Sequence, residues 1–379
     1  MNSLLGLASL GRLVKTIDRR TPPAFSLRSS ASPSLREGEE NYAFPVPSRI
    51  MATQTEKSGL ATDGRSVVLA SPRGFCAGVD LAIGIVELAV KRYGPPVYVK
   101  HQIVHNPQVV ADVEAIGAVT VERVEEVPKG AVVVFSAHGS PPSDYEKAKE
   151  RDLTVLDATC PLVTKVHHEA KKYTGEGKRV ILVGHRGHQE VIGTTGQAEM
   201  ALYDERDDNE LPEWEDDTEV VVLTQTTLSV ADTAEAVEKI QSRFNNTLVR
   251  NDICYATTNR QASATELAER CDLVLVIGAE NSSNCNRLRE VVTKRGVEAH
   301  LINGPDELDP QWLVGKKRVG ITSGASTPEK MVRAVIDAIE HDELVNIGLG
   351  EEGVSFKLPL KLRATAEEAG YAYDGSMLE

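Results

Sequence analysis

The stretch Ser66-Val-Val-Leu-Ala-Ser-Pro-Arg-Gly-Phe-Cys-Ala-Gly-Val79 joins an apolar, β-branched run to a stretch with helical periodicity. It predicts a strand at Ser66–Ala70, a glycine-containing turn, and a helix at Val79–Tyr93. Cys76 stands in the turn, close to the start of the helix, where the helix dipole favours a thiolate. For this cysteine alone, a small apolar side chain in a tight turn is an equally simple explanation.

The same alternation of short β-branched runs and amphipathic stretches continues along the chain, which is the pattern of α/β modules with parallel strands. Further strands are expected at Ala131–Phe135, Arg179–Gly184, Glu219–Thr224, Asp272–Gly278 and Arg318–Thr322. Helices are expected at Pro107–Gly117, Leu162–Tyr173, Val230–Phe244, Gln261–Arg270, Arg287–Arg295 and Pro328–His341. The sequence therefore predicts an α/β protein with mostly parallel sheets.

Cys76, Cys160 and Cys254 fall at roughly equal intervals, each just after a strand-like stretch and just before a helix-like one. This spacing suggests three similar modules, each of which brings one loop cysteine to a shared centre. The expected modules are residues 66–160, whose first strand is free to pair with the third module, residues 161–253, and residues 254–363. Residues 364–379 are acidic and rich in small side chains, so we expect a mobile tail there.

The composition is that of a globular protein, with 41% hydrophobic and 26% charged residues among 379. No apolar run approaches the roughly 18 residues of a membrane span. The formal charge of −14 argues against nonspecific binding to nucleic acid, because phosphate backbones require stripes of lysine and arginine. Five cysteines, with Cys271 and Cys285 as the remaining two, fit a reducing compartment such as the cytoplasm better than a disulfide framework.

Residues 1–65 differ in composition from the rest and are expected to be a disordered leader or an upstream extension. The segment Met1–Arg36 is basic and rich in serine, with Asp18 as its one acid. It resembles a transit peptide for organelle import more than a secretory signal. The alternative is that Met51 is the true start. Composition leaves both readings open.

Neutral hydrogen-bond donors gather where three expected strands end, at Thr226–Ser229, Ser282–Asn284 and Ser323–Thr327. Hydroxyls, an amide and free backbone N–H groups at helix starts can hold an anion without lysine. Each segment alone is explained by helix capping, and Ser326-Thr-Pro-Glu329 fits a capping box. Ligand sites collect beyond the ends of parallel strands, so the three segments together favour a phosphate site.

Histidines in loops rich in glycine and asparagine extend this anion site. We interpret His105, His138 and His188 as donors to a diphosphate and Glu190 as an acid. A zinc site formed by His185, His188 and Glu190 is the alternative. Its H-x-x-H spacing contains a glycine and lacks the helical geometry that catalytic zinc sites often use, so it is not favoured.

Two further motifs suggest competing functions. Cys254 and Arg260 match C-x₅-R, the pattern of cysteine-dependent phosphatases, but this match leaves Cys76 and Cys160 without a role. Gly348-Leu-Gly-Glu-Glu-Gly353 matches G-x-G-x-x-G. Its two acids would repel a pyrophosphate and an extended segment follows it, so the match does not support nicotinamide binding.

Seven motifs occur in the order typical of the 4-hydroxy-3-methylbut-2-enyl diphosphate reductase family, which catalyses the last step of the non-mevalonate isoprenoid pathway. They are Arg-Gly-Phe-Cys-Ala-Gly-Val, Ile-Val-His-Asn, Asp-Ala-Thr-Cys-Pro-Leu-Val, Gly-His-x-x-His-x-Glu-x-x-Gly-Thr, Thr-Gln-Thr-Thr-Leu-Ser, Ser-Ser-Asn and Ser-Gly-Ala-Ser-Thr-Pro-Glu. The chain resembles this family from about Ser66 to Arg363.

The resemblance implies three α/β modules around a pseudo-threefold axis and a central cluster held by Cys76, Cys160 and Cys254. That cluster would be [4Fe–4S], or [3Fe–4S] once its labile iron is lost, with one iron left open for the substrate hydroxyl. Glu190 would supply a proton, and Thr226 would position the substrate hydroxyl or a water. The diphosphate ligands that the resemblance implies are His105, His138, His188, Ser282, Ser283, Asn284 and Ser326.

The implied reaction removes the allylic hydroxyl as water and gives isopentenyl and dimethylallyl diphosphate, with reduced ferredoxin or flavodoxin as electron donor. The chain departs from the family pattern at Gln102, where Glu is frequent, at Ser71, where Asn is usual, and at Cys285, where Ser is usual. Its Cys-Ala-Gly motif is of the bacterial type, which favours a cytoplasmic protein over import into an organelle. A non-enzymatic iron–sulfur redox sensor is a further alternative, but it has no use for Glu190.

Overall fold

The computed structural model describes residues 64–207, 211–348, 350 and 352–370. Apart from Gly64 and Arg65, the expected leader at residues 1–65 therefore lies outside the described residues. Within the described ranges, no helix is both long and apolar enough to cross a membrane.

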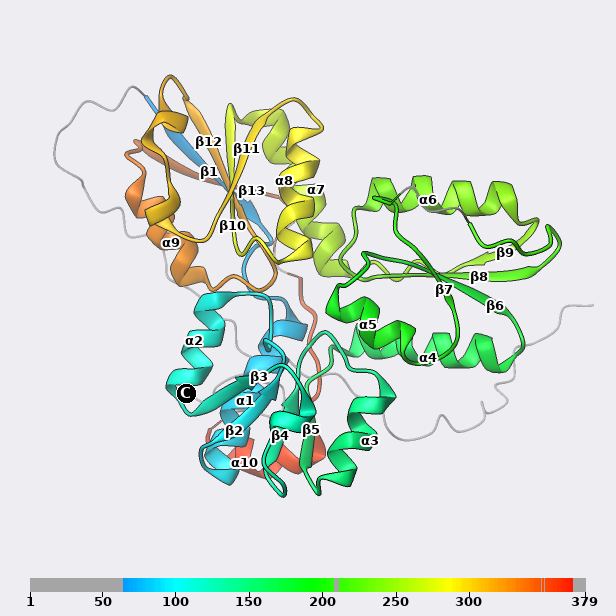
Figure 1. Cartoon of the computed structure of the whole chain (residues 1–379). Coiled ribbons are helices and arrows are strands. Elements are labelled where there is room, and N and C mark those ends of the chain that lie inside the picture. The colour runs from blue at the N-terminus through cyan, green and yellow to red at the C-terminus, as the bar shows by residue number, and fades with distance from the viewer. Residues whose placement is uncertain (1–63, 208–210, 349, 351, 371–379) are drawn as a thin grey trace, which may run out of the picture. The chain divides into compact units, whose positions relative to one another are not determined.

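One sheet combines strands that are far apart in the sequence, in the order β11-β10-β12-β1-β13. All its strand pairs are parallel. The strands are β1 (Ser66–Ser71), β10 (Leu273–Ile277), β11 (Glu298–Ile302), β12 (Arg318–Ser323) and β13 (Glu343–Gly348), and the helices that cover them are α7 (Tyr255–Arg270), α8 (Ser283–Thr293) and α9 (Glu329–Ala338). Figure 1 shows β1, in blue, among the yellow and orange strands of this sheet.

The side chains of β1 alternate between the two faces of this sheet, as the pleat of a strand requires. Val67 and Leu69 pack in a core with α9, whereas Val68 and Ala70 pack in a second core with α7 and α8. Both faces of the sheet are therefore covered by helices. This explains why β10 reads as an uninterrupted apolar run rather than as an alternating one.

Two further parallel sheets have the orders β3-β2-β4-β5 and β7-β6-β8-β9. The first contains β2 (Val97–Lys100), β3 (Ala118–Val121), β4 (Val132–Phe135) and β5 (Thr154–Asp157), with helices α1 (Ala77–Tyr93), α2 (Pro107–Ala115) and α3 (Pro142–Glu150). The second contains β6 (Arg179–Val183), β7 (Ala201–Tyr203), β8 (Glu219–Thr224) and β9 (Asn246–Val249), with helices α4 (Pro161–Gly175), α5 (Gln189–Thr195) and α6 (Val230–Arg243).

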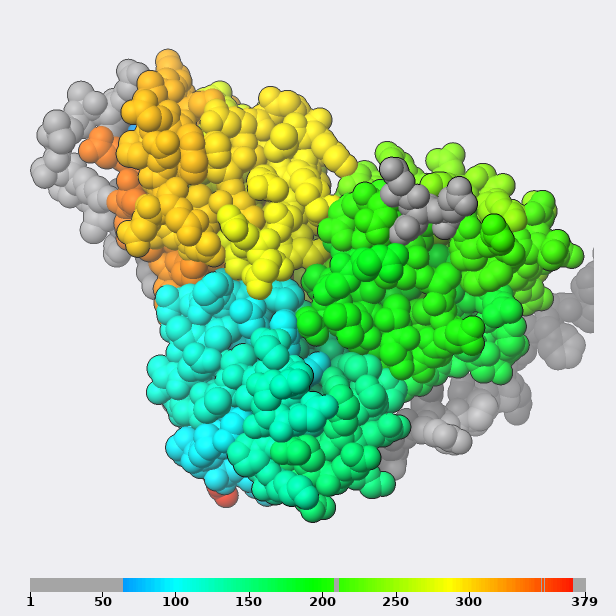
Figure 2. Space-filling view, viewed as in Figure 1, coloured from blue at the N-terminus to red at the C-terminus, as the bar shows by residue number. Residues whose placement is uncertain are grey.

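Each of these two sheets also packs between helices. In the first, Val134 of β4 faces the core formed with α1, and Phe135 faces α3. In the second, Leu182 of β6 packs towards α4 and Val183 packs towards α6. Because each sheet consists of one continuous segment, each takes a narrow range of the colour bar on the surface in Figure 2. The three parallel sheets confirm the predicted α/β fold class.

The C-terminal segment crosses back to the first helix. Helix α10 (Leu360–Glu368) packs against α1, with Leu362 fully buried and Ala366 nearly so in the α1 core, and Figure 1 shows its red ribbon beside α1. The expected mobile tail at residues 364–379 is therefore wrong for residues 364–368, because apolar side chains spaced by one helical turn pack onto α1. Residues 371–379 lie outside the described part of the chain.

The expected strands and helices are all present in the structure, mostly with ends displaced by a few residues. Helix α7 begins at Tyr255 rather than Gln261, because Cys254 caps it and accepts the N–H of Thr257. The sequence reading missed several short strands and helices, namely β2, β3, β5, β7, β9, β11, β13, α3, α5 and α10, and also the 3₁₀ turns Val124–Glu126, Pro305–Glu307 and Pro310–Leu313. Short segments show too few turns of any period to stand out.

Candidate active site

Each of the three evenly spaced cysteines begins a helix. Cys76, Cys160 and Cys254 are the N-cap residues of α1, α4 and α7. The backbone N–H of each donates to a loop carbonyl, and these bonds run from Cys76 to Ala325 (3.2 Å), from Cys160 to Ala137 (3.0 Å) and from Cys254 to Thr226 (3.1 Å). Ala325 adjoins Ser326, and Ala137 adjoins His138. One backbone contact, repeated three times, thus ties each cysteine to a loop of the expected substrate site.

The thiols of these cysteines share a buried environment. A Cβ atom added at Gly78, in the first turn of α1, would lie 2.8 Å from Sγ of Cys160 and 3.9 Å from Sγ of Cys76. Burial raises the pKa of Cys76 to about 11 and also raises the pKa values of Cys160 and Cys254. Among the described residues, the sets of three ligand atoms within 4.8 Å of one another do not include these three sulfurs. At least two of the three sulfurs are therefore more than 4.8 Å apart.

Glu190 lies in the first turn of α5, where Thr226 binds its carboxylate group. Its Oε1 atom accepts the backbone N–H of Thr226 at 2.6 Å, and its Oε2 atom accepts the Thr226 hydroxyl at 3.1 Å. The carboxyl group is 3% exposed, and this burial outweighs the two hydrogen bonds and raises its pKa to about 7. The charge of Glu190 also contributes to the raised pKa of Cys254. A carboxyl group that holds a proton near neutral pH, next to a cysteine cluster, is suited to donate that proton.

The three histidines expected to bind a diphosphate come from different loops and lie together. The ring centroids are 4.0 Å apart for His105 and His138, 5.3 Å for His105 and His188, and 6.1 Å for His138 and His188. Burial lowers the pKa of His105 to about 4 and that of His188 to about 3, and it lowers the pKa of His138 well below its ordinary value. Nδ1 of His188 accepts the N–H of Glu190 at 3.2 Å, so the ring hydrogen of neutral His188 lies on Nε2.

The polar residues at the start of α8 differ in how far their hydrogen bonds are satisfied. Ser282 caps the helix by accepting the N–H of Cys285, and the hydroxyl of Ser283 donates to the carbonyl of Thr227 at 3.1 Å. Asn284 is buried, and neither atom of its side-chain amide has a partner. Buried amide groups are rarely left unpaired, so Asn284 stays a candidate for ligand binding. In contrast, Ser326 donates to the carbonyl of His105 at 3.1 Å and holds the loop of that histidine.

The structure adds residues that sequence reasoning did not place at this site. Gln102 accepts from the side-chain amide of Asn281 at 3.0 Å and lies 3.4 Å from Nδ1 of His105. The amide of Gln225 lies 3.4 Å from the Ser283 hydroxyl. His101 places its ring edge-on to those of His105 and His138. Each of these residues is close in sequence to a predicted site residue. The folded conformation, and not the sequence spacing, brings their side chains to the site.

Arg260 does not have the free guanidinium that a C-x₅-R phosphatase requires. It is fully buried, forms an ion pair with Glu352 at 3.0 Å, and donates to the carbonyl of Gly74 at 2.9 Å. Burial also raises the pKa of Cys254, whereas a phosphatase nucleophile needs a lowered one. The structure therefore does not favour the phosphatase alternative.

The remaining cysteine near the site is a packing residue. Cys285 is fully buried in α8, with its sulfur against Gly278 and Gly324, and burial raises the pKa of its thiol.

The zinc alternative also finds no support. Nε2 of His185 lies 2.8 Å from Oε1 of Glu205, so this nitrogen is already paired. Within the described residues, the nearby set of ligand atoms within 4.8 Å joins His185 to Asp204 and Glu205, not to Glu190.

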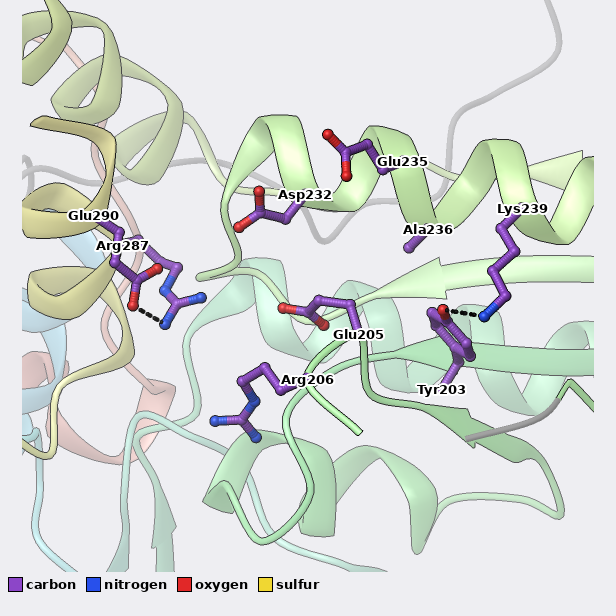
Figure 3. A pocket seen from close by; sticks show the side chains of 9 residues that line it. All are labelled: Tyr203, Glu205, Arg206, Asp232, Glu235, Ala236, Lys239, Arg287 and Glu290. Carbon is purple, nitrogen blue, oxygen red and sulfur yellow. Dashed lines mark hydrogen bonds and ion pairs between the residues drawn. The ribbon is translucent and has the colours of Figure 1, made fainter. Parts of the chain in front are cut away.

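A separate cavity of about 450 Å³ lies between α6, α8 and the loop after β7. Figure 3 shows two pairs among the side chains that line it, Arg287 with Glu290 and Lys239 with Tyr203. Arg287 binds Glu290, Lys239 binds the hydroxyl of Tyr203, and Arg206 binds Asp204. This cavity contains none of the cysteines or predicted ligands. Its walls carry four acidic side chains against three basic ones, which does not favour an anion, so it is not the predicted anion site.

The fold and the site define an α/β protein with three parallel sheets, three half-buried helix-capping cysteines and a neighbouring cluster of histidines. A family model described as LytB protein matches residues 67–340, and the chain belongs to this family. Among curated proteins, the chain is 51% identical over 305 residues to 4-hydroxy-3-methylbut-2-enyl diphosphate reductase 1 of Rhodopseudomonas palustris, covering 79% of this chain and 99% of that protein. It is 46% identical over 323 residues to 4-hydroxy-3-methylbut-2-enyl diphosphate reductase 2 of Burkholderia mallei, covering 83% and 99%.

Solved structures give the same result. The structure of the E-1-hydroxy-2-methyl-but-2-enyl-4-diphosphate reductase from Plasmodium falciparum matches with a TM-score of 0.78 and 36% identity, covering 81% of this chain and 99% of that one. A second structure, of (E)-4-hydroxy-3-methyl-but-2-enyl diphosphate reductase, the terminal enzyme of the non-mevalonate pathway, matches with a TM-score of 0.54 and 33% identity, covering 72% and 98%. The comparisons confirm the family resemblance found in the sequence motifs.

Proposed function

We propose that this chain reduces (E)-4-hydroxy-3-methylbut-2-enyl diphosphate to isopentenyl and dimethylallyl diphosphate at the site formed by its cysteines, histidines and Glu190. Two relatives that are 46% and 51% identical to this chain over most of its length are named as this reductase. The activity makes the chain an oxidoreductase of the non-mevalonate isoprenoid pathway. The observation that carries the proposed site is the repeated backbone contact that links each helix-capping cysteine to a loop of the substrate cradle.

An iron–sulfur cluster held by Cys76, Cys160 and Cys254 is the cofactor in this proposal. The donor set fits such a cluster, because it offers three thiols at helix starts that favour thiolates, with at least two of the sulfurs more than 4.8 Å apart. Gly78 leaves room where two of the thiols approach each other. A [4Fe–4S] cluster bound here supplies electrons one at a time and, at the iron without a protein ligand, a Lewis acid for the substrate oxygen.

The substrate diphosphate is bound by the histidine cluster and the start of α8. His188 presents Nε2–H, because its Nδ1 atom is occupied by the N–H of Glu190. Asn284 offers an amide with no other partner, and the N-terminus of α8 favours an anion. The full set of diphosphate ligands in the proposal is His105, His138, His188, Ser282, Ser283, Asn284 and Ser326.

Proton delivery is the role of Glu190 and Thr226. The Glu190 carboxyl group keeps its proton near neutral pH because it is buried, and the Thr226 hydroxyl lies 3.1 Å from its Oε2 atom. The hydroxyl can pass a proton onward, since a hydroxyl both donates and accepts. Removal of the allylic hydroxyl as water consumes two electrons and two protons. Glu190 supplies the proton that the leaving hydroxyl takes up, and Thr226 orients that hydroxyl.

The proposed electron donor is a reduced ferredoxin or flavodoxin, and the proposed location is the cytoplasm. The donor is the one that the family resemblance implies, and it fits a cluster that accepts electrons singly. The location is supported by relatives from bacteria and by free thiols, which persist in a reducing compartment.

Anaerobic purification followed by iron and sulfide analysis tests the cofactor, and substrate turnover with a chemical reductant tests the activity. We expect about four irons per chain and their loss in each of the variants Cys76→Ser, Cys160→Ser and Cys254→Ser. Cys285→Ser is the matched control and should keep its iron, because that thiol only packs against glycines. Protein that stays iron-free after anaerobic reconstitution would contradict the proposed cofactor. Iron-loaded protein without turnover would contradict the proposed reaction.

A further inference from the structure

His101 has an unusual backbone conformation beside the histidine cluster. It follows β2 directly, and its φ of 60° lies in the left-handed region, which among the described non-glycine residues only Asp152 shares. Its backbone N–H donates to the carbonyl of Val121 at 2.7 Å. A non-glycine residue in this region costs free energy, and such positions often lie at functional sites. The conformation therefore suggests a role for the ring that it directs.

The two ring nitrogens of His101 have different surroundings. Nδ1 lies 2.9 Å from Oε2 of Glu122, whereas Nε2 is buried and has no hydrogen-bond partner. Because a carboxylate can only accept, the ring hydrogen of neutral His101 lies on Nδ1. One nitrogen each from His101, His105 and His138 lies within 4.8 Å of the others. The His101 ring, with its unpaired Nε2, thus belongs to the cluster that is expected to bind a diphosphate.

A diphosphate bound at this cluster would contact neutral imidazoles, and the cations nearby are already paired with carboxylates. The pKa values of His105, His138 and His188 are lowered, first by burial and then by repulsion from neighbouring imidazoles that include His101. Lys100, which precedes His101, is paired with Asp144 of α3 at 2.8 Å. The proposed diphosphate ligands include no lysine or arginine. Arg206, whose charge acts on His188, is paired with Asp204 at 2.6 Å. Two imidazoles around the cluster have a carboxylate partner that stabilises a positive charge, His101 with Glu122 and His185 with Glu205, and His101 is the one grouped with His105 and His138.

We propose that His101, held by Glu122, is a fourth imidazole of the diphosphate site, which takes up a proton when the anion binds and donates to it through Nε2. This inference rests on the proposed function and adds to it the source of positive charge for substrate binding. No covalent step is involved: the proton comes from solvent, and Glu122 stabilises the resulting imidazolium. A bond from a charged donor is stronger than a neutral one, so His101 should affect substrate affinity more than turnover.

Two substitutions test the role of the His101 ring and the role of its carboxylate partner separately. His101→Asn removes the imidazole, and asparagine tolerates the left-handed backbone better than most residues. Glu122→Gln keeps a hydrogen bond but removes the charge from a side chain that is 65% exposed, so the fold should be unaffected. Glu298→Gln is the matched control, because Glu298 also pairs with a histidine, His300, at 2.9 Å but lies on β11, outside the cluster.

The test is calorimetric titration of the full, iron-loaded chain with inorganic pyrophosphate, in two buffers of different ionisation enthalpy and with a chelator present. We expect wild-type protein to take up about one proton on binding at slightly alkaline pH. His101→Asn should remove this uptake and weaken binding roughly 10- to 100-fold, and Glu122→Gln should weaken it about 3- to 10-fold. KM for the substrate should rise in parallel with little change in kcat, and Glu298→Gln should match wild type.

Unchanged affinity and proton uptake in both His101→Asn and Glu122→Gln would overturn the inference while leaving the reductase activity intact. Loss of pyrophosphate binding in wild-type protein on addition of chelator would also overturn it, since the three nitrogens would then be ligands of a metal ion. If His101→Asn fails to fold, Glu122→Gln alone decides. Absence of turnover in iron-loaded wild type would instead contradict the proposed function, so the two failures are distinguishable.

Discussion

Thr226 binds Glu190 through both of its donors, the backbone N–H to Oε1 at 2.6 Å and the hydroxyl to Oε2 at 3.1 Å. The carbonyl of the same residue accepts the N–H of Cys254. One residue therefore fixes the distance between the expected proton donor and a cysteine of the expected cluster. The predictions below test this arrangement and the packing that supports it.

The buried carboxyl group of Glu190 should set the alkaline limit of turnover. Its pKa is raised to about 7, and the protonated form is the donor, so kcat should be constant at lower pH and fall about tenfold per pH unit above that value. Glu190→Gln should lower kcat by roughly 100-fold or more and leave iron content and KM nearly unchanged. A variant that keeps wild-type turnover would remove Glu190 from proton transfer.

The same group makes folding stability depend on pH. Folded Glu190 keeps its proton up to a pKa of about 7, whereas in the unfolded chain it ionises near its ordinary value of 4.5. The folded state thus binds more protons in this window, and the free energy of unfolding should decline as pH rises from about 4.5 to 7. Urea unfolding of wild type and Glu190→Gln across this window should show a smaller decline in the variant.

Gly78 should be needed for cluster binding rather than for folding. In Gly78→Ala the new Cβ would lie 2.8 Å from Sγ of Cys160, and the cheapest relief is rotation of that thiol away from the centre. We expect a folded protein with most of its iron lost, measured by iron analysis and circular dichroism. Gly175→Ala, also in a helix but with open space around the added Cβ, should keep its iron. Equal iron content in both variants would contradict the proposed ligand geometry.

Asn284 should strengthen substrate binding while it lowers the stability of the ligand-free protein. Its amide is buried without a partner, which costs free energy in the absence of a ligand. Asn284→Ala should therefore leave the free energy of unfolding unchanged or raise it by about 1 kcal/mol, while it raises KM about tenfold or more. Asn286→Ala is the control, because that amide already donates to the carbonyl of Ser282. A stability loss in Asn284→Ala without a KM effect would show that the amide has a purely structural role.

Arg260 should be structural. Arg260→Met leaves Glu352 without its buried partner and should lower the free energy of unfolding by about 3–5 kcal/mol. Adding Glu352→Gln should recover part of the loss, because no uncompensated charge then remains. Chemical denaturation of the single and double variants measures both effects. A phosphatase would instead show a stable Arg260→Met protein with lost phosphate hydrolysis.

The sequence alone predicted much of the fold and of the site. Helix α1 carries several helical periods and β10 is an unbroken apolar run, so their type and approximate bounds followed from residue order. Cys76, Cys160 and Cys254 were predicted to lie between a strand and a helix, although the helix after Cys254 was expected only from Gln261. Short segments such as β7 contain too few residues to show a period, and α10 depends on its contact with α1.

What the tertiary structure alone decided is which residues meet. The sequence left the first strand free to pair with the third module, but its two partners, β12 and β13, and the register of each pair come from the tertiary structure. The burial that gives Glu190 a pKa of about 7 is a property of packing and not of residue type. The pair of His101 and Glu122 is likewise invisible in the sequence, because residue order determines which groups a chain carries, whereas strand register and loop conformation determine their distances and solvent exposure.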